Sequence, residues 1–298
     1  MSFQVTEAMV QQYGTNFRTL YQQRQSRLQG WCQMEPGIVG QSKSVERIGK
    51  AEAYDITSRH ADTKYVEVPH SRRWLDLQDK GWAELVDEMD KIRMLADPTS
   101  PYSALAVMAL NRAKDDIIIA AARGNARTNA GLIALPTTQK IAVGATSLTL
   151  AKLLTTKEIL DTNEVDDDQS MAMDGQSTSE QSARVFAVNA KMLTNLYGTT
   201  EIKSVDYNSV KALANGAIDT FLGFKFVRTE RLAYTSGVNS RFGLAFSRSC
   251  MGLGIGKDVV SSIDILPGKN YSAQVYARMS IAATRLEDEG VVEVACFE

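Results

Sequence analysis

Histidine and cysteine side chains carry most nucleophilic and metal-binding chemistry, and this sequence contains few of them. Its two histidines, His60 and His70, lie ten residues apart with no third ligand at a spacing that completes a zinc site. Polar contacts at an interface are the simpler interpretation. The cysteines Cys32, Cys250 and Cys296 show none of the paired spacings of a zinc site or a disulfide framework, so they are interpreted as reduced and mostly structural thiols.

A glycine-rich run from Gly252 to Lys257 is the sequence's nearest approach to a phosphate-binding loop. The Walker pattern requires glycine where Met251 stands and Ser or Thr where Asp258 stands, so the match fails at two positions. A glycine-rich turn between strands is favoured. No G-x-S-x-G nucleophile motif occurs, and we assign no catalytic, cofactor-binding or metal-binding residue. The sequence therefore predicts a protein that is not an enzyme.

Charge and composition exclude further classes. The 298 residues carry a formal net charge of −2, which gives no overall attraction to nucleic acid or anionic lipid. The N-terminus lacks a signal-peptide pattern, and no apolar run is long enough to span a bilayer. An acidic, serine-rich segment from Asp166 to Ser182 lacks the spacing of a calcium loop and predicts a solvated loop. A cytoplasmic globular protein is expected.

The element most able to organise such a chain is a long helix from Ser100 to Gly124. Ser100 suits the N-cap, Pro101 the first turn and Gly124 the stop. Helical spacing predicts a packed side formed by Ala106, Leu110, Ala113, Ile117 and Ala121. It also predicts a polar side formed by Asn111, Arg112, Asp115 and Asp116.

The remaining periodicity predicts a mixture of helices and strands. Helices are expected over Val5–Leu28, Trp82–Arg93, about Ser147–Asn163, Ala190–Tyr197 and Tyr207–Asn215. Strands are expected over Arg184–Val188, Phe221–Arg228 and Arg241–Phe246. A closing antiparallel sheet is expected from Lys257–Ile265, Tyr271–Leu286 and Gly290–Phe297.

Period-two alternation from Lys50 to Asp79 predicts a long two-stranded ribbon. An isolated ribbon is marginally stable in water, and the adjoining sequence offers helices, so its partner is expected to be another subunit. Its charges have both signs, as in a solvated face or in ion pairs that fix the register between subunits. These charged residues are Asp55, Arg59, Asp62, Glu67, Arg72 and Arg73.

Five runs spread over most of the chain resemble the tailed-phage major capsid proteins of the Hong Kong 97 type. The runs are TSRHADT (57–63), PHSRR (69–73), DKIRMLADPTSPY (90–102), DTFLGFKF (219–226) and GLGIGKD (252–258). Each alone is a weak signal, whereas their combination is specific.

The resemblance implies an α+β fold with four parts. These are an N-terminal arm (1–40), an extended β-hairpin loop (41–81), a peripheral domain (82–146 and 257–298) and an axial domain (147–256). The long helix would be the spine of the peripheral domain, with Leu110, Arg112, Asp115, Asp116 and Ile117 as its site residues. Its alanine-rich face would pack on the closing sheet, and its Arg112, Asp115 and Asp116 side would face either the shell surface or the next subunit. The extended loop would make intersubunit contacts through Arg59, His60, Asp62, His70, Arg72 and Arg73.

The implied function is self-assembly as hexamers and pentamers into an icosahedral virion shell around double-stranded DNA. The resemblance also implies assembly in the host bacterial cytoplasm, a portal, a separate scaffolding protein, a possible decoration protein, weak non-specific DNA contact and no membrane. No lysine and asparagine match a covalent cross-link, and segment 166–182 departs from the family pattern. Two alternatives remain: an encapsulin-like compartment around cargo enzymes and, more distantly, an α/β enzyme binding a phosphorylated ligand at Gly252–Lys257.

Overall fold

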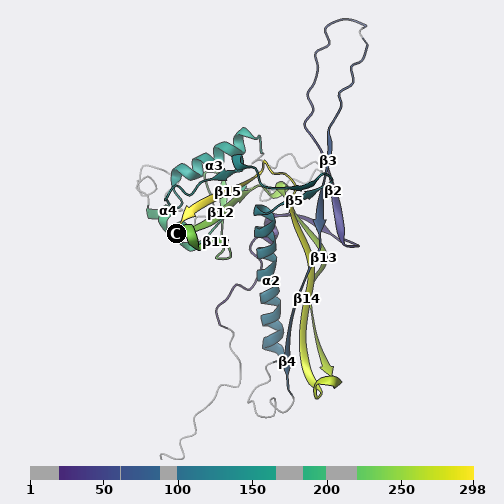
Figure 1. Cartoon of the computed structure of the whole chain (residues 1–298), viewed down its shortest axis with the longest axis vertical. Coiled ribbons are helices and arrows are strands. Elements are labelled where there is room, and N and C mark those ends of the chain that lie inside the picture. The colour runs from purple at the N-terminus through teal and green to yellow at the C-terminus, as the bar shows by residue number, and fades with distance from the viewer. Residues whose placement is uncertain (1–19, 61, 88–98, 166–183, 199–219) are drawn as a thin grey trace, which may run out of the picture. The chain divides into compact units, whose positions relative to one another are not determined.

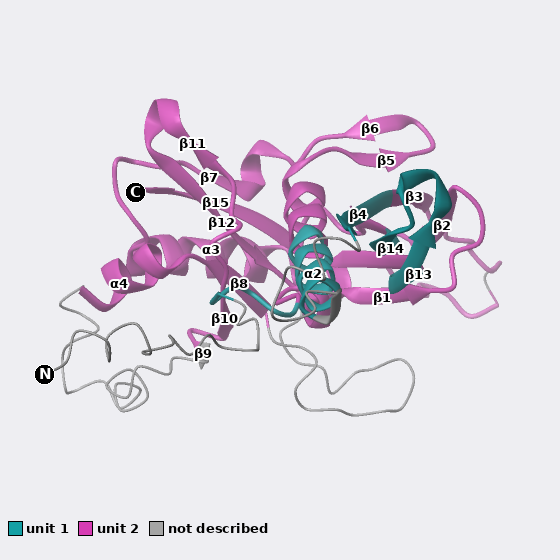
Figure 2. Cartoon of the chain, turned by 90° about the horizontal axis from the view of Figure 1, so that it is seen from below, with its two compact units in different colours: residues 1–25, 79–113, 257–280 teal, residues 26–78, 114–256, 281–298 magenta. Residues whose placement is uncertain are grey.

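The computed structural model describes residues 20–60, 62–87, 99–165, 184–198 and 220–298 (Figure 1). The chain forms two compact units (Figure 2). One comprises residues 1–25, 79–113 and 257–280, and the other comprises residues 26–78, 114–256 and 281–298. The predicted helices of residues 5–19, 88–93 and 207–215 and the acidic loop 166–182 lie outside the described residues.

Helix α2 (Thr99–Arg123) confirms the predicted long helix within one residue at each end. Its predicted packed side is buried at Ala106, Leu110 and Ile117. Towards its C-terminus the helix also buries Ile118 and Ile119, so the apolar surface there is wider than one stripe. The end of the helix is therefore enclosed in the main core.

That core surrounds a sheet of seven described strands in the second unit. Its order is β7 (Lys140–Ile141), β15 (Val291–Phe297), β12 (Ser240–Phe246), β8 (Arg184–Val188), β10 (Phe224–Arg228) and β9 (Thr220–Phe221), with β11 (Tyr234–Thr235) paired to β12. Every residue of β8 is buried. The four residues after Arg184, VFAV, form a continuous apolar run, which is typical of a strand buried on both faces. The predicted strand 221–228 is interrupted by a turn at Leu222 and Gly223, which both have positive φ.

Two further helices belong to this unit. Helix α3 (Leu150–Thr162) begins after Thr149, whose side-chain oxygen accepts a hydrogen bond from the Lys152 backbone N–H. Helix α4 (Ala190–Gly198) begins after Asn189, whose side chain accepts from the Met192 backbone N–H. Both helices were predicted, and both N-terminal caps explain where they start.

A second sheet has the order β1 (Gln33–Pro36), β13 (Met251–Leu266), β14 (Ser272–Arg285) and β4 (Gln78–Val86). Strand β13 contains the whole glycine-rich run, so the prediction of a turn there is wrong. A Cβ on Gly254 would lie 2.4 Å from Ile38 Cδ1. The glycine therefore provides room for close packing, and a strand interior does not supply the loop that cradles a phosphate.

The third sheet has the order β2 (Ser42–Ile48), β3 (His70–Asp76), β5 (Ala126–Thr128) and β6 (Gly131–Ile133). Strands β2 and β3 form a hairpin that pairs Ser42 with Asp76 and Ile48 with His70. The predicted ribbon over 50–79 is thus displaced, because the described residues between 49 and 69 form no strand. Alternation was read correctly at 70–76, but the partner strand precedes the predicted start.

Three other predictions are wrong for the same physical reason, namely that tertiary pairing overrides local spacing. Residues 82–86 lie in strand β4, paired to β14, although their apolar spacing also fits a helix. Residues 20–28 form no helix. The expected closing sheet is divided, since β15 pairs with β12 and β7 while β13 and β14 belong to another sheet.

Gly290 tests how tightly the turn before β15 is packed. A Cβ there would lie 2.0 Å from Cys250 Sγ and 2.8 Å from Cys250 Cβ, so Gly290→Ala should lower the free energy of unfolding by about 1–3 kcal/mol. Urea denaturation measures this loss, and Cys250→Ala in the same background should recover part of it. Gly268→Ala is the control because nothing lies within 4 Å of that position, and an equal loss in both single variants would contradict the packing account.

Candidate subunit interface

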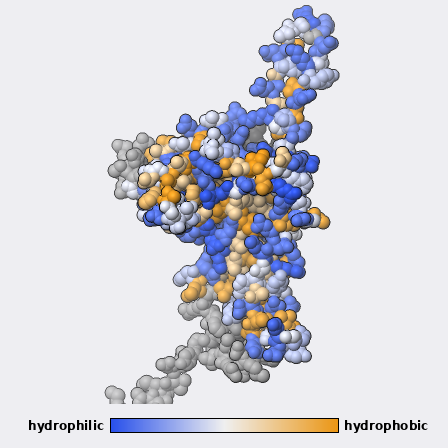
Figure 3. Space-filling model, viewed as in Figure 1, coloured by the Kyte–Doolittle hydropathy of each residue, from blue (hydrophilic) through white to orange (hydrophobic). Residues whose placement is uncertain are grey.

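The loop between β2 and β3 is the most exposed described part of the chain. All of its described residues, 49–60 and 62–69, are exposed, and in Figure 1 its two arms run away from the hairpin. Several of these residues are large and apolar, with Ile56 82% and Tyr65 92% exposed. Figure 3 shows hydrophobic side chains among hydrophilic ones along the loop. Apolar surface of this kind on a projecting loop is typical of a binding segment.

The predicted contact residues divide between the tip of this loop and its root. Arg59, His60 and Asp62 lie around the tip, where His60 has a positive φ in a turn, and His70 begins β3. All four are exposed. No group of three or more His, Cys, Asp or Glu side chains in the described ranges could hold a metal ion. The structure therefore leaves these side chains available for polar contacts.

Neighbouring arginines on β3 point to opposite faces of the hairpin, as the pleat of a strand requires. Arg72 lies on the exposed face, where it forms an ion pair with Glu46 at 2.5 Å. Trp74 shares this face, with the Arg72 guanidinium 5.9 Å and the Arg127 guanidinium 5.4 Å from its ring centroid. Its indole N–H donates to Asn129 Oδ1 at 3.0 Å, so the ring is fixed in place.

Arg73 lies on the opposite face and is only 4% exposed. One of its terminal nitrogens donates to Asp288 Oδ2 at 2.5 Å. The prediction that Arg73 contacts another subunit directly is therefore wrong, since the side chain is enclosed by its own chain. The alternation of β3 was present in the sequence, but the partner of Arg73 is 215 residues away and could not be identified from it.

Asp288 connects Arg73 to Arg285, the largest fully buried side chain among the described residues. Arg285 Nε donates to Asp288 Oδ1 at 2.9 Å. The other guanidinium nitrogens donate to the carbonyls of Ala121, Ala122 and Gly124 at the end of α2 and to that of Ile133 on β6. The last carbonyls of a helix have no hydrogen-bond partner within the helix. Arg285, which lies on β14 and is distant in the sequence, donates to these carbonyls and so caps the C-terminal end of α2.

The predicted polar side of α2 is covered by the chain's own N-terminal segment. Asp115 is fully buried and accepts from the Ser26 hydroxyl at 2.6 Å and from the backbone N–H groups of Arg27 and Leu28. Nearer the start of the helix, Arg112 donates to Gln22 Oε1 at 2.7 Å. The prediction that Asp115 faces the shell surface or another subunit is therefore wrong.

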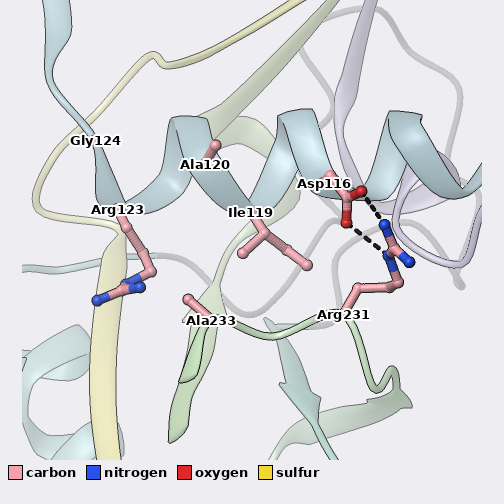
Figure 4. A pocket seen from close by; sticks show the side chains of 7 residues that line it. All are labelled: Asp116, Ile119, Ala120, Arg123, Gly124, Arg231 and Ala233. Carbon is pink, nitrogen blue, oxygen red and sulfur yellow. Dashed lines mark hydrogen bonds and ion pairs between the residues drawn. The ribbon is translucent and has the colours of Figure 1, made fainter. Parts of the chain in front are cut away.

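Asp116, one residue further, is partly exposed and lines an open pocket (Figure 4). Both of its carboxylate oxygens accept from Arg231, with Nε at 2.7 Å from Oδ1. The pocket has a volume of about 440 Å³ and is lined by Asp116, Ile119, Ala120, Arg123, Gly124, Arg231 and Ala233. Arg123 is paired with Glu293 at 2.5 Å, so both arginines of the pocket already have carboxylate partners. This arrangement is not suited to binding an anionic ligand.

The cysteines offer no activated nucleophile. Burial raises the pKa of Cys32 and of Cys250 from 9.0 to about 12, and it raises the pKa of Cys296 to about 11. A nucleophilic thiol requires the opposite shift. The buried Lys152 ammonium donates to the carbonyls of Val143, Thr146 and Ala295, which gives it a structural role in joining α3 to β15.

Solved structures share this fold over nearly the whole chain. The capsid of Ralstonia phage GP4 matches with a TM-score of 0.76 at 7% identity, covering 97% of this chain and 95% of that one. The capsid asymmetric unit of cyanophage Pam1 matches with 0.73 at 12% identity, covering 98% and 97%. The capsid of cyanophage P-SCSP1u matches with 0.72 at 15% identity, covering 98% and 94%. The fold is that of a phage capsid subunit.

The sequence comparison leads to the same family. The sequence model described as phage capsid protein matches residues 5–298, and the chain belongs to this family. It is a major capsid protein that forms the head shell of a phage, which confirms the resemblance seen in the sequence. No curated protein matches the chain. No helix in the described ranges is both long and apolar enough to cross a membrane.

Asp115 should hold segment 22–29 against α2. In Asp115→Ala the backbone N–H groups of Arg27 and Leu28 lose a charged acceptor, so their hydrogen exchange should accelerate about tenfold or more. Hydrogen exchange with peptide-level mass spectrometry measures this change. Asp116→Ala, which breaks only the exposed pair with Arg231, should leave these amides protected. Equal exchange in wild type and Asp115→Ala would contradict the assignment.

The buried thiols should make stability depend on alkaline pH. Unfolded thiols ionise near pH 9.0, whereas the folded ones stay protonated until about 11 or 12, so the unfolded state releases protons first. The free energy of unfolding should therefore fall as pH rises above about 9. Urea titrations at pH 7–10 measure this fall, which a variant with all three cysteines changed to alanine should reduce. A fall of the same size in that variant would contradict a thiol origin.

Proposed function

We propose that copies of this chain assemble as hexamers and pentamers, and that loop 49–69 of each copy lies on a neighbouring copy. The observation that carries the proposal is the loop itself, which exposes apolar residues such as Ile56 and Tyr65 without a covering segment among the described residues. Apolar surface on a projecting segment is stabilised when a partner removes it from water.

A projecting loop on one copy and a receiving surface on the next make a head-to-tail contact, because the two patches differ. Contacts of this type close into rings when the rotation between copies is a whole fraction of a turn. Hexamers and pentamers are the two ring sizes that an icosahedral shell needs. Arg59, His60, Asp62 and His70 supply exposed polar groups that would fix the register of the contact, together with the half-buried Arg72.

The division into arm, extended loop, peripheral domain and axial domain, as given above, is part of this proposal. So are assembly in the host cytoplasm, a portal, a separate scaffolding protein, a possible decoration protein and the absence of enzymatic activity. A net charge of −2 supports enclosing double-stranded DNA with weak, non-specific contact, since few phosphate counterions would be released on binding.

The phage capsid family match favours a head shell around DNA over an encapsulin-like compartment around cargo enzymes. The phosphorylated-ligand alternative loses its structural basis, because Gly252–Lys257 lies inside strand β13. Electron microscopy of the purified chain, alone and with a scaffolding protein, tests assembly directly. Shells or rings are expected, whereas a monomer at all concentrations and with scaffold would contradict the proposal.

Substitutions in the loop separate assembly from folding. Ile56→Asp and Tyr65→Asp should leave the melting temperature unchanged, since both side chains are exposed in the subunit, but should reduce the yield of shells at least about tenfold. Electron microscopy and analytical ultracentrifugation measure the yield. Val238→Asp alters an exposed apolar residue outside the loop and serves as the control. Wild-type shell yield from both loop variants would refute the role of the loop.

A further inference from the structure

We propose that the Arg73–Asp288 ion pair is a positioning contact that fixes the root of loop 49–69 to the capped end of helix α2. By fixing β3, the pair sets the direction in which the loop leaves the subunit. The inference rests on the proposed function, because it assigns a cause to the placement of the assembling loop. Both members of the pair belong to the same chain, and Arg73 is only 4% exposed.

The first step of the argument is the geometry of Asp288. Its two carboxylate oxygens are divided between two arginines, with Oδ2 accepting from Arg73 at 2.5 Å and Oδ1 accepting from Arg285 at 2.9 Å. The Asp288 side chain is 14% exposed, so the contact is shielded from most of the solvent and is screened little by salt. Movement of β3 away from this carboxylate would break a charged hydrogen bond.

The second step is the rigidity of what Asp288 is attached to. Arg285 is fully buried and donates to four backbone carbonyls besides Asp288. Three of these carbonyls belong to the end of α2, which is embedded in the main core through Ile118, Ile119 and Ala122. Asp288 is therefore held by a part of the unit that is anchored in the main core, and Arg73 connects β3 to it.

The third step is that the other attachments of β3 are weaker. The Trp74–Asn129 hydrogen bond and the Asp76–Arg127 ion pair are both exposed to solvent, so they hold β3 less firmly than a buried pair does. Strand β3 pairs with β5 at a single residue pair, Arg73 with Thr128, and on its other side it pairs with β2, which is the edge strand of the sheet. The apolar cluster beneath the hairpin has only three buried members, namely Ile38, Leu75 and Ala282. A hairpin held by so little apolar burial depends on its polar contact for a fixed orientation.

The fourth step is the energetic balance of Arg73. Its Nε and second terminal nitrogen are buried without a hydrogen-bond partner among the described residues. Replacing both members of a buried ion pair by apolar residues is often neutral, whereas removing one member is costly when the other is left without a partner. Here Asp288 keeps Arg285 as a partner, and Arg73 carries two unsatisfied donors, so the pair adds little net stability. Arg73 is thus poorly suited to stabilising the fold and well suited to defining one orientation of β3.

Arg73→Met is the decisive variant because it keeps the length of the side chain and leaves Asp288 paired with Arg285. We expect an unchanged melting temperature and hydrogen exchange in 42–48 and 70–76 that is about tenfold faster, as for loss of a hydrogen bond to a charged group. Exchange in the core strands β8 and β12 should not change. Shell yield, measured by electron microscopy, should fall at least about tenfold.

Arg231→Met is the matched control, since it breaks an arginine–aspartate pair that is about 40% exposed on each side, and it should change neither measurement. Arg73→Lys keeps the charge and should restore part of the protection of 70–76 and part of the yield. Wild-type exchange at the loop root in Arg73→Met would overturn the inference, as would faster exchange with a normal yield. If Arg73→Met does not fold, full protection and full yield in Arg73→Lys would also overturn it.

The two proposals fail in different ways. If the wild-type chain forms no shells, the proposed function fails, while the exchange comparison between wild type and Arg73→Met still tests the attachment of the loop root. If the wild type assembles and Arg73→Met assembles equally well, only the positioning role fails.

Discussion

The burial of the Arg285 guanidinium is the constraint on which the surrounding structure depends. A fully buried cation loses several kcal/mol of hydration, and it is tolerated only where acceptors surround it. Here the acceptors are the open carbonyls at the end of α2, the Ile133 carbonyl and the Asp288 carboxylate. The helix dipole adds to this stabilisation, because the negative end of α2 faces the cation. One side chain from β14 thereby fixes the end of α2.

The subunit divides its surface between groups satisfied by its own chain and groups left for assembly. The charged side chains of Asp115, Arg123 and Arg285 all have partners within their own chain. The same holds for Arg112 on the polar side of α2, which was expected to face the shell surface or another subunit. The apolar side chains of loop 49–69 are left uncovered. Such a division suits a shell protein, whose stability as an assembly comes from the same contact repeated many times.

Local rules predicted the elements whose signals are local. Helices α2, α3 and α4 and strand β8 were predicted from the spacing of their apolar residues and, for α2, from its capping residues. Local rules failed where pairing between distant segments decides the structure. The apolar spacing of residues 82–86 predicts a helix, but these residues form strand β4 because they pair with β14. The sequence around Arg73 predicts an exposed residue, but Arg73 is buried because it pairs with Asp288, which is distant in the sequence. The resemblance to the capsid family identified the function, because the short sequence runs that carry it can be recognised without knowing the three-dimensional structure.

The most direct test of the account is a cryo-electron microscopy reconstruction of the shell at a resolution that traces the main chain. We predict rings of six and five copies in which residues 49–69 of each copy lie on a neighbouring copy, with the β2–β3 root still joined to the end of α2. A shell in which this loop folds back on its own subunit, with no intersubunit contact, would contradict the central claim.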